Sequence, residues 1–357
     1  MYTKENLATM KILFSVNPGG LGHATRSLAI AELLKKKLRR AQIEIITGNS
    51  SAELFRAHTF KVHDLYRFVP YTIINGKMRF HSIWFLRYAL RYMKEKNSAR
   101  KIVEQFKPTL IINDQDLAII PSALELKIPI IYITDVLGIA FAKNPISQIW
   151  ENYLNNALTN LINSCDLVLM PLEGKSHGKT KRLGPIVRET KKTREELRKE
   201  FNFTKKTILI TGGGSEYGEF IVKKAVQAAQ NFSDADIVIV WGPGLRKKNY
   251  DSGNIREFET IENLYEYIYA SDLVITTAGR STISECLVYG TPFIALPIGN
   301  HFEQVPHALA HGFKFEDIYN LENLIEKSLN QPRAQRKSSS TERFADEIVK
   351  FSHEIRN

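Results

Sequence analysis

The chain contains 357 residues, a length that predicts about two domains, each large enough to bury a core of its own. Its 43% hydrophobic and 24% charged residues exclude a disordered or collagen-like chain. Because no apolar run approaches the roughly 18 to 20 residues of a membrane-spanning helix, and the start lacks a secretory signal pattern, we expect a cytoplasmic protein. The two cysteines, Cys165 and Cys286, lie in apolar stretches, which disfavours a disulfide or a metal site.

The formal net charge of +11 belongs mostly to the first half of the chain. Residues up to Met170 include 22 lysines and arginines against 13 acids, whereas the remainder has 27 against 25. A basic half favours a phosphate-rich partner such as a nucleotide, an anionic lipid or a nucleic acid.

Short apolar runs alternate with helical patterns along both halves, which is typical of βαβ units with a parallel sheet. The predicted strands are residues 12–16, 43–47, 110–113, 130–134, 167–170, 207–211, 237–241, 273–276 and 293–296. We therefore predict an α/β protein with two Rossmann-like domains, residues 1–170 and 171–357, whose parallel sheets face a central cleft. A final helical segment, residues 342–355, could pack on either domain.

A glycine-rich turn follows the first predicted strand. Gly19, Gly20 and Gly22 allow the backbone to approach a ligand closely, and the helix expected from about Ala24 would point free N–H groups and its positive end at the same place. The spacing matches neither the dinucleotide-binding GxGxxG pattern nor the phosphate-binding GxxxxGKS/T pattern.

His23 lies at the start of this helix, where the helix dipole favours a neutral imidazole that can accept a proton. We therefore interpret His23 as a candidate general base, the alternative being a histidine that only packs or caps. Arg26, about one turn later, could bind a phosphate or a carboxylate, or lie in solvent.

The segment from Arg67 to Lys101 carries nine lysines and arginines against one acid, with aromatic residues interleaved. A helix over residues 83–100 would place a basic stripe beside an apolar stripe, formed by Arg87, Arg91 and Lys94 and by Leu86, Leu90 and Met93. Such a helix suits a lipid-linked acceptor or an anionic membrane surface. The alternative is a solvated basic face over a core-packed stripe. Nucleic acid is disfavoured because no RNA-binding signature accompanies the segment.

Asp114 ends a predicted strand, and the string Asp114-Gln115-Asp116 resembles the DxD motif with which some enzymes bind a metal ion. No nucleotide-binding loop accompanies it, so we expect no metal here. We interpret Asp114 as an acceptor-side carboxylate, a second candidate for the base beside His23, or as a helix cap. Asp135, at the end of the next strand, is a comparable candidate.

A second glycine turn follows the first strand of the second half. Gly212, Gly213 and Gly214 make a backbone nest suited to a diphosphate, and the Ser215 hydroxyl can add a hydrogen bond. The alternative is a tight turn that binds nothing.

A third polar region follows the predicted strand at residues 273–276. Gly279 permits a tight turn, Thr282 can cap the next helix, and Glu285 lies about one turn inside it, where a carboxylate can accept hydrogen bonds from both hydroxyls of a ribose. Polar residues that include Gln304 follow the next strand, where side chains can bind sugar hydroxyls.

Together, the paired glycine turns, the Ser-x-x-x-Glu and Gly-x-Pro strings and the downstream glutamine resemble the GT-B glycosyltransferases, especially family 28, which includes the MurG-type enzymes. The resemblance spans both halves. It implies a C-terminal domain that holds a UDP-sugar, either a UDP-N-acetylhexosamine or a UDP-hexose, and an N-terminal domain that holds the acceptor. It implies no cofactor and no obligatory metal.

Family roles follow by motif match. The resemblance assigns Gly213, Gly214 and Ser215 to the diphosphate, Phe258 and Glu259 to the uracil, Gly279 and Thr282 to the phosphates, Glu285 to the ribose, Gln304 to the donor sugar, and His23 to the histidine of the first glycine loop. The sequence thus predicts a metal-independent, inverting transferase that acts on a lipid-linked or membrane-proximal acceptor, peripheral to the cytoplasmic face of the membrane.

Two alternatives stay open. The string GLGHATR, Gly20 to Arg26, also resembles the loop of a pseudaminic-pathway UDP-sugar hydrolase, which would transfer the sugar to water. Val305 stands where the transferases often have a second glutamine, which leaves the identity of the sugar open. The other alternative is a protein that binds a nucleotide sugar or RNA without catalysis.

Overall fold

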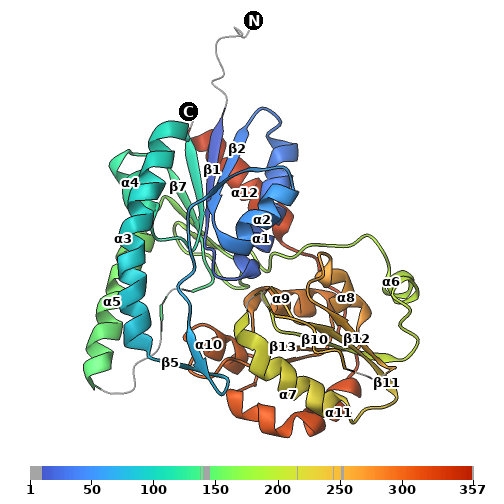
Figure 1. The fold of residues 1–357 in the computed structure, drawn as a ribbon. Helices are drawn as coiled ribbons and strands as arrows, with labels where there is room; N and C mark the ends of the chain where they lie inside the picture. The colour runs from blue at the N-terminus through green and yellow to red at the C-terminus, as the bar shows by residue number, and fades with distance from the viewer. Residues whose placement is uncertain are drawn as a thin grey trace, which may run out of the picture.

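Two parallel sheets, each covered by helices, form an upper and a lower lobe in the computed structural model (Figure 1). The structure describes residues 10–136, 138–139, 145–214, 216–243, 245–250 and 253–355. All nine predicted strands are present, and their bounds differ from the predicted ones by no more than two residues. The α/β fold with two parallel sheets is therefore confirmed.

The upper sheet has seven parallel strands in the order β3-β2-β1-β6-β7-β8-β9. Its strands are β1 (Lys11–Val16), β2 (Gln42–Thr47), β3 (Lys61–Asp64), β6 (Leu110–Asp114), β7 (Ile130–Ile133), β8 (Leu167–Met170) and β9 (Thr180–Arg182). Helices α1 (Leu21–Lys37), α2 (Asn49–Ala57), α3 (His81–Phe106), α4 (Ile120–Glu125) and α5 (Pro145–Ser164) complete this lobe.

The lower sheet has five parallel strands in the order β12-β11-β10-β13-β14. They are β10 (Lys206–Thr211), β11 (Ala235–Val240), β12 (Ile255–Phe258), β13 (Leu273–Thr276) and β14 (Phe293–Ala295). The helices of this half are α6 (Arg194–Glu200), α7 (Glu219–Ala229), α8 (Leu264–Ala270), α9 (Arg280–Tyr289), α10 (Gln304–Leu309), α11 (Leu321–Leu329) and two 3-10 turns, η1 (Glu216–Gly218) and η2 (Phe315–Asn320).

Strand order reverses direction at β1 in the upper sheet and at β10 in the lower sheet. Ligands of open α/β sheets bind beyond the carboxyl ends of the strands at such a switch point. The carboxyl ends of β1, β6, β10 and β13 and the loops after them are therefore the places where a shared site is expected. They carry the two glycine turns, Asp114 and Gly279.

Three edge strands, β3, β9 and β12, were not predicted. Each is short, carries polar or charged residues and is only half-buried apart from one exposed lysine in β3, so no continuous apolar run marks it. Strand β9 belongs to the upper sheet although it follows the predicted domain boundary after Met170.

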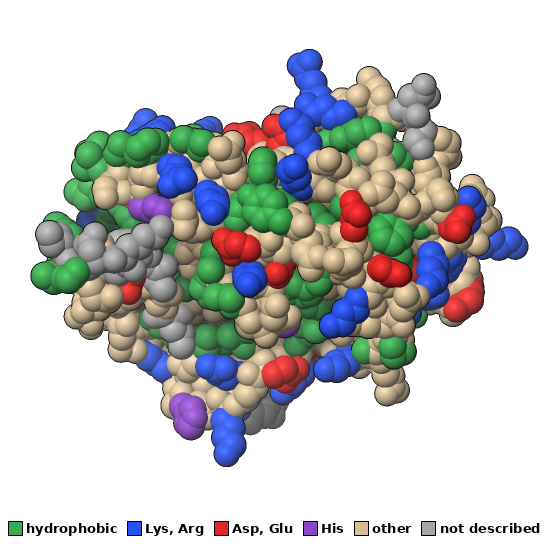
Figure 2. Space-filling view, turned by 90° about the horizontal axis from the view of Figure 1, so that it is seen from below, with side chains coloured by type: hydrophobic (Ala, Val, Ile, Leu, Met, Phe, Trp, Pro, Cys, Tyr) green, Lys and Arg blue, Asp and Glu red, His purple; other side chains and the backbone are tan. Residues whose placement is uncertain are grey.

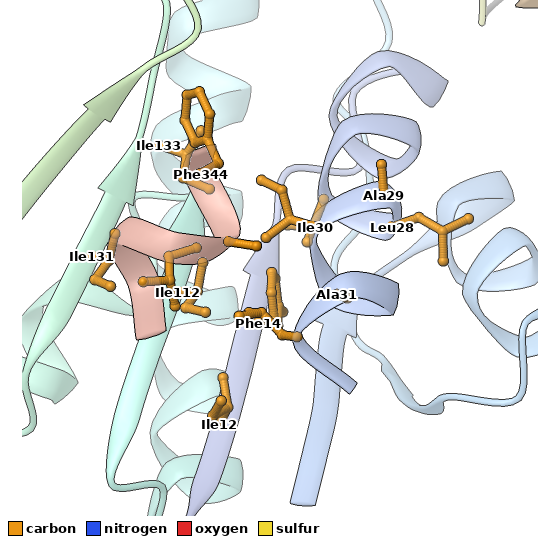
Figure 3. Close-up of a cluster of buried hydrophobic side chains, with 14 of the residues drawn as sticks. Ile12, Phe14, Leu28, Ala29, Ile30, Ala31, Ile112, Ile131, Ile133 and Phe344 are labelled. Carbon is orange, nitrogen blue, oxygen red and sulfur yellow. The ribbon is translucent and has the colours of Figure 1, made fainter. Parts of the chain in front are cut away.

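The C-terminal helix α12 (Thr341–Glu354) returns to the upper lobe and contacts α1. Phe344 is fully buried beside Ile133 and Ile30, so the last helix closes the core under the first sheet (Figure 3). The two lobes are therefore linked at two points, by the chain after β9 and by the chain before α12.

A small hairpin of the upper lobe, β4 (Thr72–Ile74) and β5 (Lys77–Arg79), reaches down to the lower lobe (Figure 1). The backbone N–H of Met78 donates to the carbonyl of Gly299 at 2.7 Å, and the N–H of Gly299 donates to the carbonyl of Gly76 at 2.9 Å. The Met78 side chain is fully buried in the lower core. The hairpin therefore adds a third link between the lobes.

Helix α3 is longer than predicted, and its apolar stripe is not packed in the core. Leu86, Leu90 and Met93 are 63%, 68% and 59% exposed, whereas Trp84, Ala99, Val103 and Phe106 make the buried face. The core-packed interpretation of this stripe is therefore wrong. Within the described ranges, no helix combines the length and the apolar character needed to cross a bilayer.

Candidate functional site

A cavity of about 840 Å³ is lined by residues of both lobes. It is bounded by the two glycine turns, by the start of α9 and by the inner sides of α3 and α5. Of the predicted site residues, Gly19, Gly20, Gly22, His23, Gly213, Gly214, Gly279, Thr282, Glu285 and Gln304 line it. Ser215 lies outside the described residues.

The two glycine turns touch each other across the cavity. A Cβ atom on Gly214 would lie 2.3 Å from the backbone nitrogen of Leu21, so only glycine permits this approach. Gly20 has a left-handed φ of 78°, which favours glycine. A Cβ atom added to Gly20 would lie 3.7 Å from the carbonyl oxygen of Gly214. Ser281 Oγ also donates to the Gly22 carbonyl at 3.1 Å. The turns of the two lobes therefore meet at this point of the cavity.

Two helix N-termini face this meeting point. Helix α1 begins at Leu21, three residues earlier than expected, so His23 lies within its first turn. Gly20 and Gly279, the N-cap residues of α1 and α9, supply no side-chain cap. The first N–H groups of both helices therefore remain available to an anion, which the helix dipoles also favour.

His23 is paired with Asp114. Its Nδ1 atom lies 2.9 Å from Asp114 Oδ1, and its side chain is 15% exposed where it borders the cavity. With Nδ1 occupied by the carboxylate, Nε2 is the ring nitrogen left to accept a proton from a ligand. This arrangement, a base oriented by a buried acid, is the one that nucleophile activation requires.

Asp114 does not border the cavity, so it is not the acceptor-side carboxylate that the sequence suggested. It is fully buried, and its oxygens accept bonds from Arg26 Nε at 2.8 Å and Ser27 Oγ at 2.7 Å in addition to the contact with His23. Burial alone would raise its pKa, but the Arg26 guanidinium and the His23 ring lower the pKa to about 2. The carboxylate therefore stays ionised and is sterically shielded from an acceptor.

Asp135 connects the two lobes. It accepts a bond from Arg26 Nη1 at 3.2 Å and one from Arg280 Nε, on α9 of the lower lobe, at 3.0 Å. Burial opposes ionisation, yet Arg26 and Arg280 hold the pKa of Asp135 well below its usual range. His307 lies 3.8 Å away, and burial lowers its pKa to about 4, so it remains neutral near pH 7.

No cluster of three His, Cys, Asp or Glu side chains that could hold a metal ion occurs in the part of the chain that the structure describes. Asp114 and Asp116 accept bonds from different groups: Arg26 binds Asp114, whereas Ser15 Oγ donates to Asp116 at 2.6 Å. The two carboxylates of the DxD string are therefore already engaged with protein groups.

On the lower-lobe side, Glu285 is 8% exposed and forms no hydrogen bond with the described residues. Burial raises its pKa to about 7, and the Arg188 guanidinium only partly offsets this. Arg188 lies over the Tyr265 ring, and its buried Nε has no partner within the described ranges. Arg188 Nη1 donates to the Glu262 carbonyl at 2.9 Å, so the Glu285 carboxylate and the Arg188 Nε atom are the groups without a hydrogen bond at this end of the cavity.

Phe258 and Glu259 do not line the cavity, contrary to the motif match. Phe258 packs its ring edge-on against Tyr267 in the core of the lower lobe. The cavity is instead lined by the next residues along the chain, Thr260 to Glu262. Phe258 and Glu259 therefore do not face the cavity, because the Phe258 ring packs in the core.

Gln304 begins α10 at the rim of the cavity. Its Oε1 atom accepts from the Ile298 N–H at 2.9 Å, which leaves its amide NH₂ for a ligand. Glu303 also lines the cavity, and burial raises its pKa. The hairpin contact at Gly299 holds this same loop from the other lobe.

Comparison with known families identifies both halves. Residues 207–350 match the glycosyltransferase family 28 C-terminal domain, and residues 10–163 match a glycosyl transferase family 1 domain. The chain is a glycosyltransferase, and it resembles the MurG-like members of family 28.

Individual relatives agree with this family. The chain is 25% identical over 321 residues to an uncharacterized glycosyltransferase of Methanosarcina acetivorans, covering 84% of this chain and 82% of that protein. It is 24% identical over 315 residues to the UDP-N-acetylglucosamine–N-acetylmuramyl-(pentapeptide) pyrophosphoryl-undecaprenol N-acetylglucosamine transferase of Christiangramia forsetii, covering 81% and 78%. The crystal structure of Acinetobacter baumannii MurG superposes with a TM-score of 0.58 at 17% identity, covering 96% and 100%. The fold is therefore GT-B.

Sequence reasoning missed two arginines of this glycosyltransferase site. Arg188 lies in the linker after β9, and Arg280 opens α9 directly after Gly279. The signal for Arg280 was its place at a helix N-terminus beside the predicted phosphate loop. Arg188 had no comparable signal. The linker contains many basic residues, and the sequence does not show which of them lines the cavity.

Proposed function

We propose that this glycosyltransferase moves a sugar from a UDP-sugar to the hydroxyl of an acceptor that lies between α3 and α5, without a metal and with inversion at the sugar carbon. One observation carries the proposal: a single cavity joins His23 of the upper lobe to Gly213, Gly214 and Glu285 of the lower lobe. A nucleophile, a leaving group and a base can therefore meet in it.

The donor is proposed to lie against the lower lobe. Glu285 forms no hydrogen bond with the described residues and suits the two hydroxyls of a ribose, which would satisfy a buried carboxylate. The amides of Gly213 and Gly214 and the uncapped N-terminus of α9 suit a diphosphate. Arg188, over Tyr265, borders the part of the cavity proposed for the nucleobase.

In the proposed reaction, Nε2 of His23 takes the proton of the acceptor hydroxyl as its oxygen attacks the anomeric carbon. The bond between that carbon and the diphosphate oxygen breaks on the opposite face, and UDP leaves with the bonding electrons. Glycine-turn amides stabilise the charge that develops on the diphosphate. Asp114 and Arg26 keep the histidine ring in place, and Asp114 lies outside the cavity lining.

The acceptor is proposed to be lipid-linked and to reach the site from a membrane surface. Large apolar side chains are exposed on two helices, namely Ile83, Leu86, Leu90 and Met93 on α3 and Ile149, Trp150 and Tyr153 on α5. In Figure 2 hydrophobic side chains gather along the left margin, the side on which α3 and α5 lie in Figure 1, with Lys and Arg beside them. Apolar side chains flanked by basic ones suit an anionic bilayer.

The experiment that tests the proposal supplies purified protein with UDP-N-acetylglucosamine, UDP-glucose and other UDP-sugars, with and without a lipid extract. We expect UDP release that depends on the extract and labelled sugar in the lipid phase. Equal sugar release without extract would instead establish the hydrolase that the GLGHATR string suggests. The aromatic cavity beyond His23, with room for an acceptor, favours transfer over hydrolysis.

A further inference from the structure

The part of the cavity that extends between α3 and α5 is largely apolar. Helix α3 contributes Trp84, Phe85 and Tyr88, and α5 contributes Leu154, Leu158 and Leu161. These positions repeat every three or four residues, so each helix turns one face to the cavity. The exposed apolar side chains Leu86 and Leu90 of α3 are not among the cavity residues. The cavity extension is therefore distinct from the proposed membrane face.

One charged side chain in this extension is unsatisfied. Arg91 follows Tyr88 by one turn of α3 and lines the cavity. Its Nη1 atom is buried and has no hydrogen-bond partner among the described residues, and its charge acts on Glu95 without an ion-pair contact in the described part of the chain. A buried guanidinium nitrogen without a partner costs free energy, so a ligand that supplies one would be stabilised there.

Glu95, the acid on which the charge of Arg91 acts, does not supply this hydrogen bond. Glu95, one turn further along α3, accepts a hydrogen bond from the backbone N–H of Arg67 at 2.7 Å. Burial raises the pKa of Glu95 to about 7, so near neutral pH it is only partly ionised. Arg67 is also engaged, because its guanidinium binds Asp64. Arg91 is therefore the cation of this group that remains available to a ligand.

We infer that Arg91 binds an anionic group, a phosphate or a carboxylate, carried by the apolar part of the acceptor within the cavity extension. This inference rests on the proposed function, since it describes the acceptor of the same transfer. The anion would pair with Nη1 while the aromatic and leucine side chains enclose the attached chain. Arg91 is then a binding residue that fixes how deeply the acceptor enters, and so how its hydroxyl meets His23.

The test measures binding by titration calorimetry with three probes of equal chain length, decyl phosphate, decanoate and decanol, each kept monomeric. We expect decyl phosphate to bind wild-type protein at least about tenfold more tightly than decanol, the size of one charge-assisted hydrogen bond. Decanoate binding as tightly as decyl phosphate would support a site for either anion, and weaker decanoate binding would support a phosphate site.

The variants are Arg91→Gln and Arg91→Lys, with Arg87→Gln as the matched control. Arg87 is an exposed arginine one turn earlier on the same helix. We expect Arg91→Gln to remove the preference for decyl phosphate over decanol, Arg91→Lys to retain part of it, and Arg87→Gln to leave it unchanged. Equal losses in Arg91→Gln and Arg87→Gln would overturn the inference, because they indicate general surface attraction.

UDP is titrated into the same samples. Wild-type protein that binds UDP and shows no preference among the three decyl probes would overturn the Arg91 site and leave the proposed function intact. Wild-type protein that does not bind UDP would contradict the proposed function itself. Arg91→Gln that binds UDP as wild type does is folded, so its loss of decyl phosphate binding supports the site.

Discussion

The Nδ1 atom of His23, in the first turn of α1, lies 2.9 Å from the Oδ1 atom of Asp114, the last residue of β6, 91 positions along the chain. Asp114 is itself fixed by Arg26 and Ser27 behind the histidine. This chain of contacts orients the imidazole before any substrate arrives. Preorganisation of this kind lets a weak base act efficiently in the reaction.

Replacing His23 by Ala should lower kcat by about a hundredfold or more, because the general base that accepts the proton of the acceptor hydroxyl is removed. The affinity for UDP should stay close to that of wild type, since the proposed donor contacts lie on the lower lobe. Steady-state kinetics and UDP titration check the two parts. A variant with wild-type kcat would remove His23 from the mechanism.

The Asp114→Asn variant should lose both activity and stability. The neutral amide removes one of the two counter-charges of the buried Arg26 guanidinium, the other being Asp135, and removing one partner of a buried ion pair costs about 3 to 5 kcal/mol. The lost orientation of His23 should lower kcat further. Denaturant unfolding measures the first effect. A variant as stable as wild type would show that Asp135 alone compensates Arg26.

Glu285→Gln should stabilise the ligand-free protein at alkaline pH. In the folded state the pKa of Glu285 is about 7, against an ordinary value of 4.5. Ionisation is therefore penalised in the folded state as pH rises from about 4.5 to 7, and the penalty is fully present above 7 and absent below 4.5. Glutamine carries no such penalty, so the gain above pH 7 should reach about 3 kcal/mol at most.

The measurement for Glu285→Gln is Tm at pH 5 and pH 8, together with UDP affinity. Glu326→Gln, an exposed change on α11, is the control. We expect a higher Tm at pH 8 only for Glu285→Gln, and weaker UDP binding by that variant. Unchanged UDP binding would separate Glu285 from the donor site.

The Met78→Ala variant tests the hairpin link between the lobes. Met78 belongs to the upper lobe and is fully buried in the lower core, so truncation should cost about 2 to 5 kcal/mol. Because the hairpin also holds the loop at Gly299, the KM for the donor should rise. Met93→Ala, at a position 59% exposed on α3, should have neither effect. Equal Tm values for the two variants would contradict the link.

Membrane attachment should depend on the exposed stripe of α3. Leu86→Asp combined with Leu90→Asp places two charges on this face without disturbing a core, since both side chains are more than 60% exposed, at 63% and 68%. In sedimentation with vesicles that contain anionic lipid, we expect most of the double variant to stay in the supernatant, whereas wild-type protein sediments. The UDP affinity of the variant should be unchanged. Undiminished binding would refute the role of this face.

Patterns of the sequence predicted the sheets and both glycine turns because buried parallel strands and glycine-rich turns leave local signals. The edge strands β3 and β12 lacked such signals, since half-buried polar residues resemble loops. The place of Asp114 behind His23 could not be predicted, because it depends on how the loops after β1 and β6 pack. Nor could Phe258 be assigned to the core, since its neighbour Tyr267 is on another element.

The crystal structure of the protein in complex with UDP tests the central claim most directly. We expect the ribose hydroxyls at the Glu285 carboxylate and the diphosphate at the amides of Gly213 and Gly214 and the start of α9, with His23 facing the terminal phosphate across the cavity. UDP bound elsewhere on the lower lobe, or on the upper lobe, would contradict the account.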